Sequence, residues 1–217
     1  MQTVRWLRQD RQVVDRRSPE TLNQPGKLRL LDQTLLPERE LYLEMDSLAE
    51  VIDAIRRLAV RGAPAIGCGA ALGLAAAAQH YRVLSVEEFF RRLEADGAEL
   101  AAARPTAVNL RWAVERVISE TRAAAPALNT APRTLLGFAL DILSEDIGLC
   151  RAIGEHGRQL LFDGATVLTH CNAGALATGD YGTALAPVYC AHEEGLKVKV
   201  YSDETRPLLQ GSRLTAW

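Results

Sequence analysis

Cys171 has the position in this sequence that best suits a reactive side chain. It ends a short apolar run, Ala165–Cys171, that predicts a buried strand, and a loop with a glycine, Asn172–Ala175, follows it. Open parallel sheets bind ligands outside the carboxyl ends of their strands, where loop amides can stabilise a thiolate. A lone cysteine is more often a small buried hydrophobe, so position alone leaves both interpretations open.

Two arginines precede predicted helix starts and could bind an anion. Arg61-Gly62-Ala63-Pro64 combines a guanidinium, a glycine that permits close backbone approach, and the free amides of a helix N-terminus. Arg104 stands in the same relation to Pro105 and the helix after it. The two arginines could converge on one phosphate, although a surface arginine before such a helix is the somewhat commoner arrangement.

Polar residues also follow the second predicted parallel strand. Asp203–Pro207 could bind a sugar hydroxyl and Gln210 could hydrogen-bond a polar ligand, although both could simply be solvated. His170 and Cys171 are neighbours in a strand and should point to opposite faces, which disfavours a Cys/His dyad. No Gly-x-Gly-x-x-Gly follows the first strand, so a nicotinamide cofactor is not supported.

The composition is that of a globular protein. The 217 residues include 25 Lys and Arg against 27 Asp and Glu, and 48% are hydrophobic, which argues against disorder and offers no basic cluster for nucleic acid or an anionic membrane. Met1–Arg17 contains no apolar signal region, and Ala63–Ala78 is too short and weakly hydrophobic for a membrane span. The sequence therefore predicts a cytoplasmic protein.

The cysteines show no paired spacing, so neither a zinc site nor a disulfide framework is expected. Apart from Cys171 they fall in helical patterns among apolar neighbours, and we expect Cys68, Cys150 and Cys190 to belong to the core.

Residues 1–130 predict a mainly helical domain with a small antiparallel sheet. The alternating segments of the sheet are Thr3–Trp6, Lys27–Leu31 and Glu40–Leu43. Ser47 and Glu50 form a capping box before a helix that should run to about Ala59. Further helices are expected over 65–80, where glycines suit close packing, from Ser85 with Phe89, Phe90 and Leu93, after Pro105 with Val108, Trp112 and Val117, and from Thr134 past Leu149.

Residues 131–217 predict a linking helix and the start of a Rossmann-like domain, which makes the fold class α/β. The strand 165–171, a helix over 183–194 that ends at Gly195, and the strand 196–202 form one parallel βαβ unit, and another helix should begin within 208–217. Parallel sheets normally have several strands, so the domain is expected to be truncated. The alternative is a small domain completed by the helical half or by a partner chain.

Four segments together resemble the methylthioribose-1-phosphate isomerase family, which also includes regulatory subunits of the translation-initiation guanine exchange factor and ribose-1,5-bisphosphate isomerases. The segments are Val60–Gly67, Arg104–Leu110, Thr169–Gly174 and Asp203–Gly211. The resemblance implies conversion of 5-methylthioribose 1-phosphate to 5-methylthioribulose 1-phosphate in methionine salvage. It also implies a homodimer that uses no metal and no organic cofactor.

The same resemblance implies roles for individual residues. Cys171 would be the catalytic thiol, and the substrate contacts would be Arg61, Gly62, Ala63, Arg104 and Gln210. The family's catalytic aspartate, in a Gly-Ala-Asp-Arg segment, and its Asn-Lys substrate contact are absent from these residues. The chain by itself is therefore expected to bind substrate weakly without turning it over. A regulatory or binding protein like the exchange-factor subunits, and a ribose-1,5-bisphosphate isomerase, are the alternatives.

Overall fold

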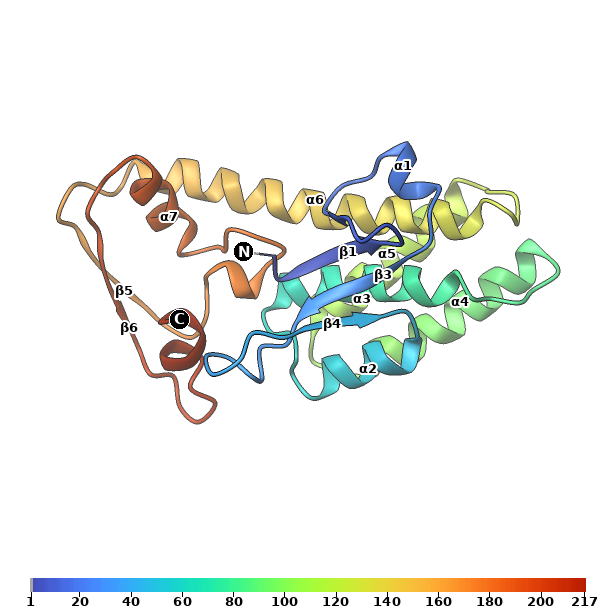
Figure 1. The fold of residues 1–217 in the computed structure, drawn as a ribbon, viewed down its shortest axis with the longest axis horizontal. Coiled ribbons are helices and arrows are strands. Elements are labelled where there is room, and N and C mark those ends of the chain that lie inside the picture. The colour runs from blue at the N-terminus through green and yellow to red at the C-terminus, as the bar shows by residue number, and fades with distance from the viewer. Residues whose placement is uncertain (1) are drawn as a thin grey trace.

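The computed structural model describes residues 2–217 and has two parts that one long helix, α6 (Ala131–Arg158), connects (Figure 1). One part packs an antiparallel sheet on a group of helices, and the other holds a pair of parallel strands and α7 (Ala186–Glu193). The predicted α/β class is confirmed. Within residues 2–217 no helix has both the length and the apolar character needed to cross a membrane.

The antiparallel sheet has the strand order β2-β1-β3-β4. Its strands are β1 (Val4–Arg8), β2 (Val13–Val14), β3 (Gly26–Leu31) and β4 (Tyr42–Met45). Three of the four were predicted within a few residues. Strand β2 and the short helix α1 (Pro19–Leu22) were missed, because β2 is only two residues long and gives no period.

Side-chain caps begin two of the helices as the sequence predicts. Ser47 and Glu50 form the complete capping box of α2 (Leu48–Arg56). The Ser85 hydroxyl accepts a hydrogen bond from the Glu88 backbone amide at the start of α4 (Val86–Ala101). Helix α2 ends before the predicted Ala59, because Leu58 has a φ of 65° and lies outside the right-handed helical region.

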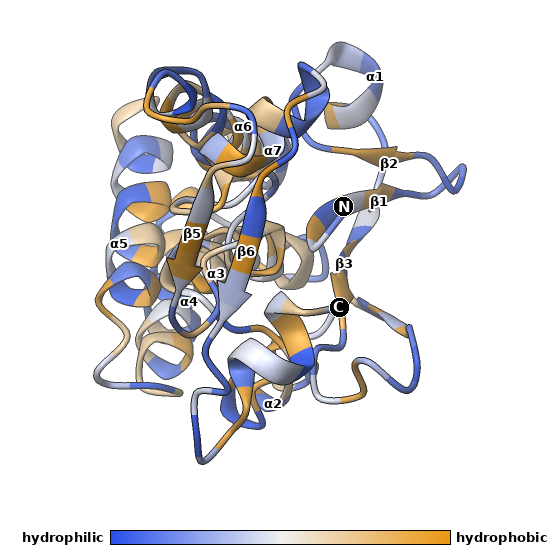
Figure 2. Ribbon diagram, turned by 90° about the vertical axis from the view of Figure 1, so that its left-hand side faces the viewer, coloured by the Kyte–Doolittle hydropathy of each residue, from blue (hydrophilic) through white to orange (hydrophobic). Residues whose placement is uncertain are grey.

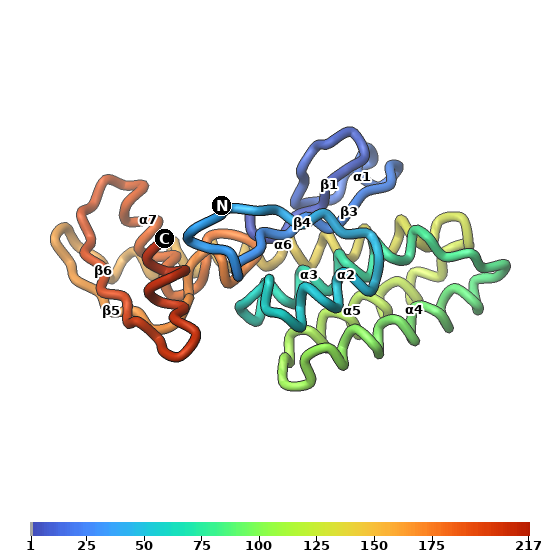
Figure 3. The backbone as a smooth tube through the Cα atoms, turned by 60° about the horizontal axis from the view of Figure 1, so that its bottom comes forward, coloured from blue at the N-terminus to red at the C-terminus, as the bar shows by residue number. Residues whose placement is uncertain are grey.

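Helix α3 (Ala63–Ala78) is the centre of the helical part, and every residue from Ala65 to Ala78 is buried (Figure 3). It begins two residues earlier than predicted, and the predicted burial of its glycines is confirmed. Gly67 packs against the backbone of Asn109, and Gly73 packs against Val51. Small residues therefore allow neighbouring helices to approach this one closely.

Helix α5 (Val108–Ala123) packs on α3 with less of its apolar surface than the sequence suggests. Val117 is buried, but Val108 is 78% exposed and Trp112 is 47% exposed. In α4, Phe89, Phe90 and Leu93 are buried as expected.

The predicted parallel βαβ unit is confirmed. Strands β5 (Thr166–Thr169) and β6 (Lys199–Ser202) pair in parallel and α7 connects them. In the view of Figure 2 this pair faces the viewer, and it includes apolar residues that are exposed. Those exposed residues include Leu168, Val200 and Tyr201.

Helix α6 contributes to both parts. Leu135, Leu140 and Leu143 lie in the main apolar core, whereas the C-terminal half of the helix packs on α7. The division of the chain into two domains after residue 130 stays a prediction. The expected helix within 208–217 is a π-helical turn, η2 (Gly211–Thr215).

Two glycines of α3 give a matched test of this packing. A Cβ at Gly73 would lie 2.5 Å from Cγ1 of Val51, a stiff and buried side chain, whereas the nearest atom at Gly69 would be 3.6 Å away. Gly73→Ala should lower the free energy of unfolding by about 1 to 3 kcal/mol through overpacking. Gly69→Ala should raise it by up to about 1 kcal/mol through helix propensity. Urea unfolding of both variants measures the difference, and equal effects would contradict the packing described here.

Candidate functional site

Cys171 lies where β5 ends, and both of its backbone polar groups are held by threonine hydroxyls. Its amide donates to Oγ1 of Thr205 at 2.9 Å, and its carbonyl accepts a hydrogen bond from Oγ1 of Thr215 at 2.7 Å. Its φ of 63° is uncommon for a residue with a side chain. Contacts from beyond β6 thus fix the backbone of this half-buried cysteine.

The loop after Cys171 is anchored to the helical part by the antiparallel sheet. Arg5 on β1, only 3% exposed, donates to the Gly179 carbonyl at 2.6 Å. Nε2 of Gln33, just after β3, donates to the Leu176 carbonyl at 2.7 Å. Partners more than 140 residues apart therefore hold the loop at the strand end.

Gly62 brings the Arg61 turn against the same loop. Its φ of 87° and the position of its Cα leave no room for a side chain, because a Cβ would overlap the backbone of Ala177. Glycine is required here by both conformation and space. The turn before α3 and the loop after β5 are consequently in direct contact.

Arg61, in this turn, lies near enough to Arg104 and Arg213 for their charges to act on it. Burial lowers the pKa of the Arg61 guanidinium, and the charges of Arg213 and Arg104 lower it further, while Cys171 acts in the opposite direction. Among the described residues, none of the three arginines forms a salt bridge with a carboxylate. The guanidinium of Arg213 donates to backbone carbonyls instead. The site therefore has a concentration of positive charge that no carboxylate within residues 2–217 pairs with.

Buried polar atoms without partners identify what the site lacks. Among residues 2–217, Nη1 of Arg61, Oε1 of Gln210 and Nδ2 of Asn172 are buried and have no hydrogen-bond partner. Such groups are costly unless something pairs with them. Arg61 and Asn172 offer donors, and Gln210 offers an acceptor, so a ligand with both anionic oxygens and hydroxyl groups would satisfy them.

Gln210 directly precedes the turn η2, and its neighbour Gly211 packs closely against the end of β6. Gly211 opens the turn η2, and a Cβ there would overlap the Asp203 carbonyl at the end of β6. The Asp203 carboxylate lies 3.0 Å from Nδ1 of His170, so these two side chains pair with each other.

The predicted core position of the other cysteines holds for two of them. Cys68 and Cys150 are buried. Cys190 is only partly buried, and its sulfur lies 3.2 Å from the Tyr181 hydroxyl, which also donates to Glu193. Cys190 faces a polar cluster because the α7 face that carries it turns toward α6.

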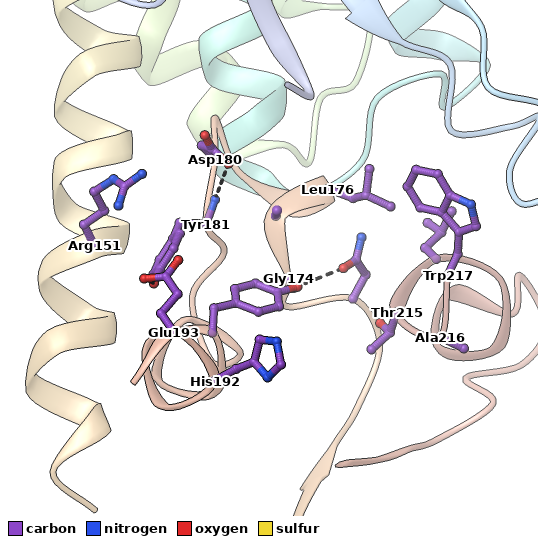
Figure 4. Close-up of a pocket in the computed structure, with 14 residues that line it drawn as sticks. Arg151, Gly174, Leu176, Asp180, Tyr181, His192, Glu193, Thr215, Ala216 and Trp217 are labelled. Carbon is purple, nitrogen blue, oxygen red and sulfur yellow. Dashed lines mark hydrogen bonds between the residues drawn. The ribbon is translucent and has the colours of Figure 1, made fainter. Parts of the chain in front are cut away.

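A cavity of about 550 Å³ adjoins the loop at Asn172 and Gly174. Figure 4 shows it between α6, α7 and the last residues, with Arg151, Tyr181, Glu193 and Trp217 around it. None of Cys171, Arg61, Arg104 and Gln210 lines this cavity. Within residues 2–217, no three His, Cys, Asp or Glu side chains gather in a way that could hold a metal ion.

Several residues that shape the site have no recognisable signal in the sequence. Arg5, Gln33 and Arg213 lie in segments whose local pattern indicates only strand, loop or helix. Their partners are backbone carbonyls far along the chain, and no spacing rule reveals such pairs. The motif Asp203–Gly211 points toward Arg213, which follows it by two residues, but does not include it.

The fold and the three arginines define an α/β protein with a candidate anion site near the carboxyl ends of its parallel strands. The chain belongs to the initiation factor 2 subunit family, whose model matches residues 59–217.

Two curated relatives are similar to most of the chain. One from Geobacillus thermodenitrificans, named methylthioribose-1-phosphate isomerase, is 53% identical over 188 residues, 87% of this chain and 53% of the relative. One from Moorella thermoacetica, named 5-deoxyribose 1-phosphate isomerase, is 51% identical over 193 residues, 88% of this chain and 55% of the relative. The chain thus spans about half the length of the curated relatives it matches.

Solved structures show the same fold. The 5-methylthioribose 1-phosphate isomerase from Pyrococcus horikoshii is 36% identical with a TM-score of 0.82, over 94% of this chain and 60% of that one. The translation initiation factor eIF-2B, subunit delta, from A. fulgidus is 44% identical with a TM-score of 0.81, over 88% and 56%. The resemblance drawn from the four sequence motifs is confirmed.

The contact of Gly62 with Ala177 can be tested against a matched glycine. Gly164 also has a positive φ, but a Cβ there would have no neighbour within 4 Å. Gly164→Ala should lower the free energy of unfolding by about 1 to 2 kcal/mol, the cost of a left-handed conformation. Gly62→Ala adds overpacking and should cost about 1 to 3 kcal/mol more. Chemical unfolding compares the two, and a similar cost for both would contradict the close approach of the loops.

Proposed function

We propose that the protein containing this chain converts a five-carbon aldose 1-phosphate, foremost 5-methylthioribose 1-phosphate, into the corresponding ketose. In this proposal Cys171 is the catalytic thiol. The substrate contacts are Arg61, Gly62, Ala63, Arg104 and Gln210. The observation that carries the proposal is the half-buried Arg61 guanidinium, whose Nη1 is buried without a partner and which, among the described residues, has neighbouring arginines but no carboxylate partner.

The orphaned atoms suit a sugar phosphate better than a simple anion. A phosphate would accept from Arg61 and from free amides at the start of α3, where no side chain caps the helix. A sugar hydroxyl would donate to Oε1 of Gln210, which is buried and unpaired among the described residues. The turn before α3 and the turn at η2 would then bind opposite ends of one ligand.

The reaction explains why such a site would be enclosed. A sugar phosphorylated on its anomeric oxygen cannot open its ring by losing a hydroxyl proton, so the ring oxygen needs acid assistance. Hydrogen then moves between C2 and C1, as a proton or as a hydride, and exclusion of water protects that step. The fixed backbone of Cys171 would hold its thiol at one position throughout.

Names of relatives support a class of substrate more strongly than one substrate. Methylthioribose 1-phosphate and 5-deoxyribose 1-phosphate share the anomeric phosphate and lack a phosphate on C5. A ribose-1,5-bisphosphate isomerase would need a second anion site. The homodimer expected from the family resemblance and the cytoplasmic location expected from the sequence belong to the same proposal.

The second candidate function is regulatory binding, and the likeness to the eIF-2B subunit favours it. A chimera tests the two functions. It joins residues 1–217 to the part of the Geobacillus relative that this chain does not match. We expect the chimera to isomerise methylthioribose 1-phosphate, and Cys171→Ser in it to abolish turnover while retaining substrate binding. Substrate-independent assembly with no turnover in a folded chimera would support the regulatory function.

The charge of Arg61 can be tested in the 217-residue chain alone. Arg61→Met should weaken binding of methylthioribose 1-phosphate about ten- to a hundredfold, as expected for loss of a hydrogen bond to a charged group. Titration calorimetry measures this change. Arg56→Met removes the same charge from an exposed position five residues earlier and should leave the affinity unchanged. Equal weakening in both variants would indicate only a general effect of net charge.

A further inference from the structure

Arg213, in the π-helical turn η2, reaches from the strand-end part of the molecule to the helical part. Its Nη2 donates to three backbone carbonyls in the segment after β3: to Gln33 at 3.4 Å, to Thr34 at 3.0 Å and to Leu36 at 2.7 Å. Backbone carbonyl oxygens thus bind one end of the guanidinium. Because carbonyls carry no net charge, they leave the positive charge of Arg213 unneutralised.

The residue after Arg213 strengthens the same attachment. Leu214 is 3% exposed and packs in a small apolar cluster. The other buried members are Leu31, Leu36 and Leu176. This cluster combines β3, the segment that accepts from Arg213, the loop after Cys171 and the turn η2.

The same turn also contacts the ends of both parallel strands. Thr215 donates to the Cys171 carbonyl, and Gly211 fits against the Asp203 carbonyl with no room for a side chain. Gln210 directly precedes the turn, with its Oε1 buried and unpaired among the described residues. One short segment therefore connects the proposed catalytic cysteine, the proposed sugar contact and the helical part. Single π-helical turns are rare and occur frequently at functional sites.

Arg213 is also close to Arg61. After burial, its charge is the largest cause of the lowered pKa of the Arg61 guanidinium. The two residues come from different parts of the molecule, so the distance between them depends on how these parts are aligned. A shift of η2 away from the segment 33–36 would move Gln210 away from Arg61.

We propose that Arg213 is a positioning residue that fixes the η2 turn on the helical part, so that Gln210 and Arg61 face the same ligand. This role rests on the proposed function, because it assumes that Arg61 binds the phosphate and Gln210 the sugar. It assigns to Arg213 no contact with the substrate. Its effect should therefore appear in the sugar-dependent part of the affinity, while phosphate binding by Arg61 and Arg104 is largely retained.

The experiment compares two probes, inorganic phosphate and methylthioribose 1-phosphate, on the 217-residue chain. The dissociation constant of inorganic phosphate divided by that of methylthioribose 1-phosphate gives a ratio that isolates the contribution of the sugar contacts. Arg213→Met should reduce this ratio about tenfold, and Gln210→Leu should do the same, since each loses about one hydrogen bond to the sugar. The double variant should be no worse than either single variant, because both changes remove the same contact.

Two further variants separate positioning from charge and from folding. Arg213→Lys keeps a donor for the carbonyls and should retain most of the ratio. Arg39→Met removes an exposed arginine on the segment between β3 and β4 and should leave the ratio unchanged. Hydrogen exchange should show faster exchange of amides 209–216 in Arg213→Met, with the amides of α3 still protected.

Each outcome decides the role of Arg213. A reduced ratio in Arg213→Met that is not additive with Gln210→Leu supports positioning. Equal weakening of both probes shows that Arg213 acts through its charge and overturns positioning. An unchanged ratio with a loosened turn shows a purely structural residue and overturns it as well. A wild-type chain that binds both probes equally contradicts the proposed function itself, and with it the positioning role.

Discussion

The charge of Arg61, which is half-buried and has no carboxylate partner among the described residues, is the constraint on which the proposed site depends. Val60 and Ala65 on either side are fully buried, and Gly62 touches Ala177, so the backbone that carries this side chain cannot move toward solvent. A buried cation without a partner is unfavourable, and two neighbouring arginines add repulsion. The packing of α3 must offset this cost. An anionic ligand would offset this cost, so the proposed affinity for phosphate would follow from how the helical core is built.

Backbone strain is present in the segments at the ends of the parallel strands, which hold three of the seven described non-glycine residues with positive φ. Cys171, Thr205 and Leu209 all have positive φ although none is glycine, and each costs about 1 to 2 kcal/mol in that region. Hydrogen bonds among these segments hold the strained conformations: Cys171 donates to Thr205, and Leu209 donates to the Thr205 carbonyl. Conformations of this kind persist only where surrounding contacts over-determine them. The end of the parallel sheet is therefore shaped by contacts between segments more than by local preference.

This distinction explains how much could be predicted from the sequence. The capping box at Ser47 and the glycine at Gly195 depend on residues a few positions apart, and the βαβ unit depends on the local pattern of each of its three elements; each is predicted from the sequence. The hydrogen bonds from Arg5 to the Gly179 carbonyl and from Arg213 to the Leu36 carbonyl join residues more than 170 positions apart. Such pairs produce no periodic pattern in the sequence. The motifs predict which residues approach a ligand, whereas the residues that hold those segments together are visible only in the structure.

The junction between the two parts is built differently from the core, and this has a consequence for function. The core of the helical part is large and apolar, whereas four leucines are buried in the cluster at η2. Other attachments are polar, such as the hydrogen bonds from Gln33 and Arg213 to backbone carbonyls and the ion pair of Arg5 with Asp180. Regions with little buried apolar surface open at lower free energy than the core. Opening of this junction would separate Gln210 from Arg61 while α3 and its neighbours stay folded. The alignment of the site is therefore less stable than the fold that carries it, and a ligand that contacts both parts would stabilise the aligned state.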